Sequence, residues 1–184
     1  MSKFDKFEPQ PRDLWRSTDP SAVVPLIPYI RGLSYAEPCV GEGDLVRLLE
    51  PHATCKWSSD IQPQEGSLQK NAVFLTKEDV KDCDVITTNP PFSWSMLQPL
   101  CDHLPTLKPT WLLLPADSMH NKYFRPYMDK CSLVLSIGRL FFHKAEESLD
   151  VKYAKGTANM CWYRLEDYEC DTIYKGWVRK GALL

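Results

Sequence analysis

The segment 84–92, DVITTNPPF, constrains the fold more than any other part of this 184-residue chain. Residues 84–88 are mostly apolar or β-branched, which is typical of a buried strand. Pro90 and Pro91 then lack backbone N–H donors and have a fixed φ, so the strand cannot continue through them. The pattern predicts a strand that ends at Thr88 and delivers Asn89 to the carboxyl edge of a sheet, where ligands of open α/β sheets bind.

Short apolar runs alternate with helical patterns along the rest of the chain. Such an alternation indicates a mostly parallel sheet with helices on both faces. A long polar segment, 144–157, precedes the last strand and favours an antiparallel closing hairpin. The expected strands cover 34–40, 54–61, 72–76, 84–88, 111–114, 133–137 and 160–164, and the expected helices cover 44–49, 95–103 and 123–130.

Length and composition indicate one domain over residues 1–184, with an N-terminal arm at 1–20 and a C-terminal tail at 167–184. The net charge is −2, so contact with nucleic acid would need a local basic patch. The seven cysteines are widely spaced without a Cys-x-x-Cys pair, which favours free thiols and no metal site. A polar N-terminus and the absence of a long apolar run favour a cytoplasmic protein with no membrane contact.

A glycine loop follows the first expected strand. The sequence Glu37-Pro38-Cys39-Val40-Gly41-Glu42-Gly43 leads into a helix that begins at Asp44. Because Gly41 and Gly43 lack Cβ atoms, the main chain there can approach an adenosine or a methionine carboxylate. Glu37, at the end of the strand, could accept hydrogen bonds from a ligand ammonium group. Taken alone, the loop fits a tight turn without a ligand equally well.

Acidic residues follow the next two expected strands. Asp60 stands 17 residues after Gly43, near the distance at which an acid accepts from ribose hydroxyls in nucleotide-binding sheets. Glu78 and Asp79 follow segment 72–76, where an acid could accept from an adenine amino group. The alternatives are a solvated turn acid for Asp60, and a helix N-cap or a loop charge for the other pair.

The residues at the end of segment 84–92 suit the chemistry of an exocyclic amine. The amine of adenine or cytosine is a poor nucleophile because its lone pair is delocalised into the ring. The Asn89 side-chain oxygen and the Pro90 carbonyl could accept hydrogen bonds from its two N–H groups and so localise that lone pair. Phe92 could stack on a base that has left its helix. An ordinary Pro-Pro turn is the alternative, and Trp94 either lines such a site or begins the core face of the next helix.

These motifs, in this order, resemble class I S-adenosylmethionine-dependent methyltransferases. The closest likeness is to amino-methylating DNA methyltransferases, including small phage-type adenine enzymes, whose catalytic motif is [DNS]PP[YFW]. The resemblance implies a Rossmann-like α/β fold with a mostly parallel seven-stranded sheet, helices on both faces and a closing hairpin at 139–142 and 160–164. It implies that segment 15–20 closes over the methionine end of the cofactor. It implies a catalytic motif of Asn89, Pro90, Pro91 and Phe92, and S-adenosylmethionine bound by Trp15, Thr18, Glu37, Pro38, Cys39, Gly41, Gly43, Asp60, Ile61, Asp79 and Asn89.

The resemblance further implies methyl transfer to adenine in DNA, and it includes phage proteins that act in the host cytoplasm. RNA, a protein glutamine amide and a non-catalytic binding role are the alternatives. Only residues 167–184 follow the last expected strand, which leaves no room for a large target-recognition domain. Loop 144–157 could supply specificity instead. The mixed cationic and aromatic segments 144–155 and 175–180 are either phosphate contacts or solvated surface.

Overall fold

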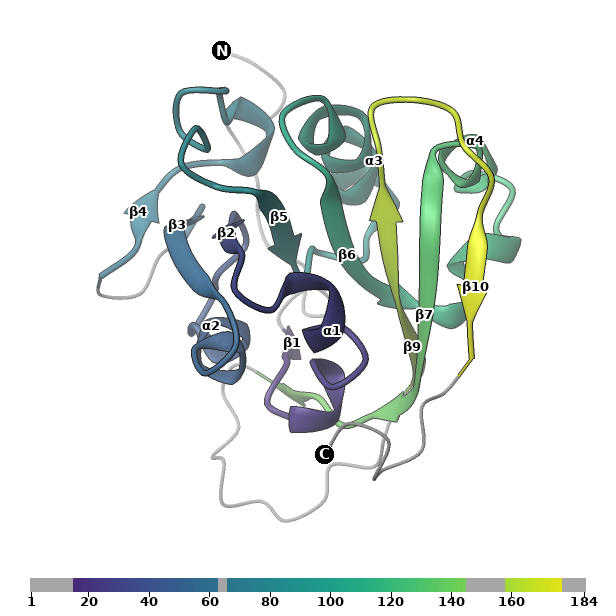
Figure 1. Cartoon of the computed structure of the whole chain (residues 1–184), viewed down its shortest axis with the longest axis horizontal. Helices are drawn as coiled ribbons and strands as arrows, with labels where there is room; N and C mark the ends of the chain where they lie inside the picture. Colours follow the sequence, from purple (N-terminus) through teal and green to yellow (C-terminus); the bar gives the residue numbers. More distant parts are fainter. Residues whose placement is uncertain (1–14, 63–65, 145–157, 177–184) are drawn as a thin grey trace.

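The computed structural model describes residues 15–62, 66–144 and 158–176, and an eight-stranded sheet forms its centre (Figure 1). The strand order is β10-β7-β9-β6-β5-β2-β3-β4, and within the described residues β9 alone runs antiparallel to the others. The strands are β2 (Ser34–Glu37), β3 (Thr54–Asp60), β4 (Leu68–Gln69), β5 (Val85–Thr88), β6 (Thr110–Pro115), β7 (Cys131–Leu140), β9 (Ala158–Leu165) and β10 (Ile173–Lys175). The expected mostly parallel α/β sheet with an antiparallel closing hairpin, here β7 and β9, is confirmed.

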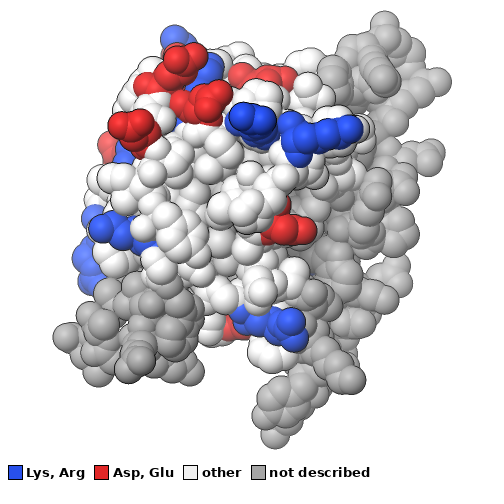
Figure 2. Space-filling view, turned by 90° about the vertical axis from the view of Figure 1, so that its right-hand side faces the viewer, with Lys and Arg blue, Asp and Glu red and all other residues white. Residues whose placement is uncertain are grey.

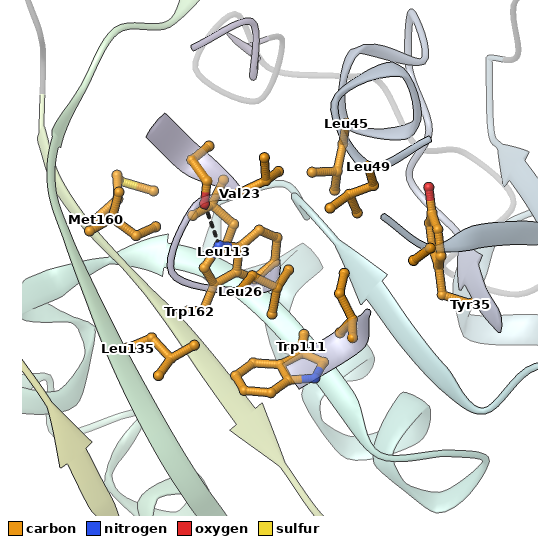
Figure 3. Packing of buried hydrophobic residues seen from close by; sticks show 14 of the residues in the cluster. Val23, Leu26, Tyr35, Leu45, Leu49, Trp111, Leu113, Leu135, Met160 and Trp162 are labelled. Atoms are coloured by element: carbon orange, nitrogen blue, oxygen red, sulfur yellow. Dashed lines mark hydrogen bonds between the residues drawn. The ribbon is translucent and has the colours of Figure 1, made fainter. Parts of the chain in front are cut away.

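Helices cover both faces of this sheet, because β6 is buried almost throughout while its successive side chains point to opposite faces. Trp111 and Leu113 pack with α1 (Ile27–Ile30) and α2 (Asp44–Leu49), whereas Leu112 and Leu114 pack with α3 (Trp94–His103) on the opposite face. Figure 3 shows the first of these clusters, in which the Trp162 indole donates to the Ala22 carbonyl at 2.7 Å. The α-helices are α1 (Ile27–Ile30), α2 (Asp44–Leu49), α3 (Trp94–His103) and α4 (Arg125–Met128), and the 3-10 helices are η2 (Pro20–Ala22), η3 (Ala72–Phe74), η4 (Leu104–Thr106) and η5 (Ala116–His120).

A second, two-stranded sheet joins the N-terminal arm to the end of β7. It consists of β1 (Trp15–Arg16) and β8 (His143–Lys144), which pair antiparallel with Arg16 opposite His143. The Asp19 carboxylate reinforces this attachment, because Oδ1 accepts from Ser21 N at 2.9 Å and Oδ2 accepts from Phe141 N at 3.3 Å. Residues 15–22 therefore lie against the main sheet.

Three expectations need correction. Segment 72–76 is not a strand: Asn71 Oδ1 caps a 3-10 helix by accepting from Val73 N at 3.1 Å, and Ala72 and Leu75 pack against α3. The third parallel strand is instead the short β4. The tail adds an eighth strand, β10, to the seven expected, and the helix expected at 123–130 is only α4, with Pro126 in its first turn. None of the described helices is long and apolar enough to cross a bilayer.

Candidate active site

The sheet brings the expected site residues to one edge. β5, β2 and β3 are consecutive, parallel neighbours, so their carboxyl ends lie together. These ends are Thr88, Glu37 and Asp60. Asn89 follows the first of them and the glycine loop follows the second. Segments more than 50 residues apart in the chain therefore meet at the edge where ligands of open α/β sheets bind.

The glycine loop has a backbone conformation that favours glycine at two positions. Gly41 and Gly43 have φ values of 47° and 75°, in the left-handed region that side chains with a Cβ rarely adopt. Gly43 is the N-cap of α2, and its N–H donates to Val40 O at 2.8 Å. A Cβ added at Gly41 would have no atom within 4 Å, so the loop is open on that side. An exposed backbone beside a helix N-terminus can receive a ligand without side-chain obstruction.

Asp60 holds this loop to the end of β3. Its Oδ2 accepts from Gly41 N at 2.9 Å, and its Oδ1 accepts from Gln62 N at 2.9 Å. Each carboxylate oxygen keeps a lone pair for a further donor such as a ribose hydroxyl. Asp60 and its neighbour Ile61 are both partly buried. The expected ribose acid thus also fixes the position of the glycine loop.

Glu37 is a buried carboxyl group at the end of β2, where the glycine loop begins. It is 1% exposed, and its Oε1 accepts from Cys39 N at 3.1 Å. Its Oε2 makes no well-formed hydrogen bond to a described residue, although the Thr88 hydroxyl is close enough to lower the pKa. Burial outweighs these contacts and raises the pKa of Glu37 to about 8. A carboxyl group in this state would gain most from a cationic ligand, which favours its charged form.

The Asn-Pro-Pro-Phe motif forms the turn between β5 and α3. Pro90 is buried, whereas Asn89 and Phe92 are partly buried. The ring of Phe92 meets that of the buried Phe142 edge to face, with centroids 6.4 Å apart and an interplanar angle of 86°. Phe142 belongs to the segment that attaches the N-terminal arm. Sequence reasoning assigned that segment to the closing hairpin and did not predict its contact with the motif.

The N-terminal arm is tied to the start of α2 by ion pairs. Asp44 Oδ2 lies 2.7 Å from Arg16 Nε, and Asp44 Oδ1 lies 3.0 Å from Arg16 Nη2 and 2.5 Å from Arg47 Nη2. Burial would raise the pKa of Asp44, but the two guanidinium groups outweigh it and hold that pKa below its usual range. The arm therefore lies beside the glycine loop, as the expected cofactor role of Trp15 and Thr18 requires. Of these two, Trp15 lies in β1, and Thr18 is partly buried.

We expect Asp44→Asn to lower the free energy of unfolding at pH 7 by about 1–3 kcal/mol, since two cations lose a shared, largely buried partner. Glu50→Gln, at an exposed position after the same helix, is the matched control. Urea denaturation measures both variants. Because the folded-state pKa of Asp44 is lowered, the advantage of the wild type should persist at neutral pH and shrink as the pH falls below about 4. Equal stability of Asp44→Asn and the control would contradict this role.

Asp79 is engaged in its own loop. Its Oδ2 accepts from Thr76 N at 2.7 Å, from Thr76 Oγ1 at 2.6 Å and from Lys70 Nζ at 2.6 Å. Its neighbour Glu78 pairs with Lys81 on the surface. These contacts order the connection between β4 and β5, and a role for Asp79 towards a cofactor adenine stays a prediction. Residues 145–155 and 177–180, considered above as phosphate contacts, lie outside the described residues.

The chain resembles known proteins in its fold and not in its sequence, since no protein-family model and no curated protein sequence matches it. A solved structure of a candidate RNA methyltransferase from Pyrococcus horikoshii matches with a TM-score of 0.58 and 11% identity, over 88% of this chain and 90% of that protein. A candidate class I S-adenosylmethionine-dependent methyltransferase from Listeria monocytogenes matches with a TM-score of 0.51 and 9% identity, over 95% of this chain and 68% of that protein.

A third likeness is to the methyltransferase subunit of a type I restriction-modification system from Streptococcus thermophilus. Its TM-score is 0.50 and its identity 10%, over 92% of this chain and 47% of the subunit. The chain thus spans about half the length of that subunit. Together with the strand order and the glycine loop, these likenesses show that the chain has the fold of class I S-adenosylmethionine-dependent methyltransferases.

Proposed function

We propose that the chain is an S-adenosylmethionine-dependent methyltransferase that acts on the exocyclic amine of adenine in DNA. The observation that carries the proposal is the meeting of two motifs at one sheet edge. The Asn-Pro-Pro-Phe turn after β5 lies beside the glycine loop after β2, which Asp60 anchors. A cofactor site and an acceptor site that must exchange a methyl group have to be adjacent, and neighbouring strands supply that adjacency.

The residues at this edge fit S-adenosylmethionine. Glu37 is a buried acid whose Oε2 makes no well-formed hydrogen bond within the described part of the chain, which suits the ammonium group at the methionine end of the cofactor. Gly41 presents open backbone, and Asp60 keeps acceptor capacity for ribose hydroxyls. When bound, the cofactor supplies an electrophilic methyl group on a sulfonium centre.

The catalytic contribution of the chain is positioning and polarisation of the amine. The Asn89 side-chain oxygen and the Pro90 carbonyl accept hydrogen bonds from the two N–H groups of the amine. This draws the amine nitrogen towards tetrahedral geometry and localises its lone pair. Alignment of that nitrogen with the methyl group lowers the barrier further. As the new N–C bond formed, the bond between the methyl group and the sulfonium would break and its electron pair would leave with a neutral thioether. The amine nitrogen would become positively charged, and its proton would then leave to solvent. Asn89 therefore acts as an acceptor and need not be a strong base.

Phe92 completes the acceptor side. Its partly buried ring is held edge-on by Phe142, so one orientation of the ring is favoured before any substrate arrives. A planar base could stack on this ring while its amine reaches Asn89. A ring fixed in advance loses little conformational entropy when a base binds, which favours a nucleobase as the acceptor.

DNA is the first choice of acceptor, and RNA is the second. The likeness to a restriction-modification methyltransferase subunit supports DNA, and the likeness to a candidate RNA methyltransferase favours RNA. Both likenesses are consistent with a nucleobase that stacks on Phe92. A protein glutamine amide would use the same acceptor oxygens but would not need the aromatic face.

The test is incubation of the protein with labelled S-adenosylmethionine and with unmethylated DNA, RNA or total protein in separate reactions. We expect label in DNA, recovered after digestion as methyladenine. Label in RNA or in glutamine would keep the chemistry and replace the acceptor. Failure to bind S-adenosylmethionine in a calorimetric titration of folded protein would overturn the proposal in favour of a non-catalytic role.

A further inference from the structure

An aromatic surface with one partly buried and one exposed ring lies beside the proposed acceptor site. It consists of Trp94, Tyr123 and Lys122, which we call the aromatic shelf. We propose that the aromatic shelf binds an unpaired nucleotide adjacent to the target base, by stacking with its ring and pairing with its phosphate. The inference deepens the proposed function and rests on it for the identity of the target base.

The topology places the shelf next to the catalytic motif. β5 and β6 are parallel neighbours, with Thr88 opposite Leu112 in the register. The chain leaves β5 through the Asn-Pro-Pro-Phe turn and reaches Trp94, the first residue of α3. It leaves β6 through η5 and reaches Tyr123 at the same edge of the sheet. Trp94 is thus only two residues from Phe92. Tyr123, in the connection that follows β6, lies next to Trp94.

The rings of Trp94 and Tyr123 are close and only moderately inclined. Their centroids are 5.9 Å apart and their planes differ by 32°. Trp94 also meets the Tyr127 ring at 6.0 Å, which anchors its inner side to α4. The shelf is thus supported from below by the core and presents its outer part to solvent.

The outward orientation of Tyr123 is built into its turn. Asn121 Oδ1 accepts from Tyr123 N at 3.0 Å, and Asn121 O accepts from Phe124 N at 2.9 Å. This turn sends Phe124 inward, where it is 1% exposed, and leaves Tyr123 54% exposed. Phe124 fills the core with Tyr163 and Tyr127, so packing of the core does not require Tyr123. A large aromatic side chain held outward beside an acceptor site suits a planar ligand.

Lys122 supplies a positive charge that can pair with the phosphate of a nucleotide. Its Nζ lies 4.8 Å from the centroid of the Tyr123 ring, and the side chain is exposed. Among the described residues it forms no ion pair with a carboxylate, so it is available for a phosphate. A phosphate would draw the ammonium group away from the ring and free that face for a base. A nucleotide offers both the planar ring and the phosphate that this pair of side chains can bind.

Stacking matters here because the chain has no excess of positive charge with which to hold nucleic acid. On the face shown in Figure 2, lysine and arginine side chains lie scattered around a largely uncharged area, with acidic side chains among them. The whole chain has a net charge of −2. An aromatic shelf can hold nucleic acid with few cations, but only where the base is free of its own stack. The shelf therefore predicts a preference for single-stranded or locally opened substrate.

The experiment uses a fluorescent single-stranded oligodeoxynucleotide that contains a single adenine. In matched oligonucleotides, the nucleotide on either side of that adenine is replaced by an abasic residue. We expect wild-type protein to bind the intact oligonucleotide about 5- to 100-fold more tightly than one of the abasic versions. Tyr123→Ala should bind both with nearly the same affinity, and Lys122→Gln should weaken binding and reduce its salt dependence. Tyr174→Ala, at a 57% exposed position on β10 across the sheet, is the matched control.

The outcomes separate this inference from the proposed function. If the wild type methylates adenine but Tyr123→Ala still distinguishes intact from abasic oligonucleotides, the shelf is not the binding subsite. If the wild type binds neither version measurably, the inference is also overturned, and the methylation assay decides the proposed function separately. If the Tyr123-dependent preference is found without any methyl transfer, the subsite stands and the proposed function fails. Tighter binding to an aromatic or acidic peptide than to the oligonucleotide would reassign the shelf to a protein partner.

Discussion

Asn89→Ala is expected to lower the rate of methyl transfer by about 10²–10³-fold, the usual effect of removing one polar group that stabilises a developing charge. The change removes the side-chain oxygen that we propose accepts a hydrogen bond from the amine, and it leaves only the Pro90 carbonyl for that role. Asn89→Asp keeps an acceptor oxygen at the same position, so it should recover a substantial part of the lost rate. Single-turnover methyl transfer at saturating S-adenosylmethionine measures the effect on the chemical step.

Asn159→Ala is the matched control, because Asn159 is an exposed asparagine on β9. It should leave the rate unchanged. A calorimetric titration shows whether Asn89→Ala still binds S-adenosylmethionine, and we expect a smaller loss in affinity than in rate. Methyl transfer by Asn89→Ala at the rate of the control would remove Asn89 from the mechanism.

Glu37→Gln is expected to alter the pH dependence of two quantities in opposite senses: the free energy of unfolding and the affinity for S-adenosylmethionine. The folded-state pKa of Glu37 is raised to about 8 because the carboxyl group is buried, so the folded protein holds a proton that the unfolded chain has lost. The stabilising contribution of that proton is complete below the ordinary pKa near 4.5 and is lost as the pH rises towards 8. Relative to Glu37→Gln, the wild type should therefore lose on the order of 1 kcal/mol of unfolding free energy per pH unit across this interval.

The affinity for S-adenosylmethionine should change in the opposite sense. A cationic ligand beside Glu37 favours the carboxylate, so wild-type affinity should rise with pH up to about 8 relative to the variant. Urea denaturation and calorimetric titration across this pH range measure the two effects, with Glu50→Gln as the exposed control. Parallel pH profiles for the wild type and Glu37→Gln would show that Glu37 neither holds an extra proton nor faces the cofactor.

Much of the site could be predicted from local patterns in the sequence. Two prolines after an apolar run predicted the end of β5 and the place of Asn89, because proline cannot continue a central strand. The paired glycines predicted a strand-to-helix loop with accessible main chain, and the structure adds that both have positive φ. Asp60 was predicted from its spacing to Gly43, and its hydrogen bond to Gly41 shows that the two motifs meet.

The errors arose where long-range contacts decide the structure. Segment 72–76 is apolar enough for a strand, but Ala72 and Leu75 pack on α3, and Asn71 caps the segment as a 3-10 helix. β10 is short and exposed, and only its pairing with β7 makes it a strand. Similarly, no local pattern signals that Arg16 pairs with Asp44, or that Tyr123 meets Trp94, because these partners are 28 and 29 residues apart in the chain.

The most direct test of the central claim is identification of the atom that receives the methyl group. DNA is incubated with the protein and S-adenosylmethionine carrying a deuterated methyl group, then digested to nucleosides and analysed by mass spectrometry. The proposed roles of Asn89 and Pro90 predict a trideuteromethyl group on the exocyclic nitrogen of adenine. Transfer to a ring nitrogen, a ring carbon or an oxygen, or no transfer to any nucleic acid or protein amine, would contradict the account.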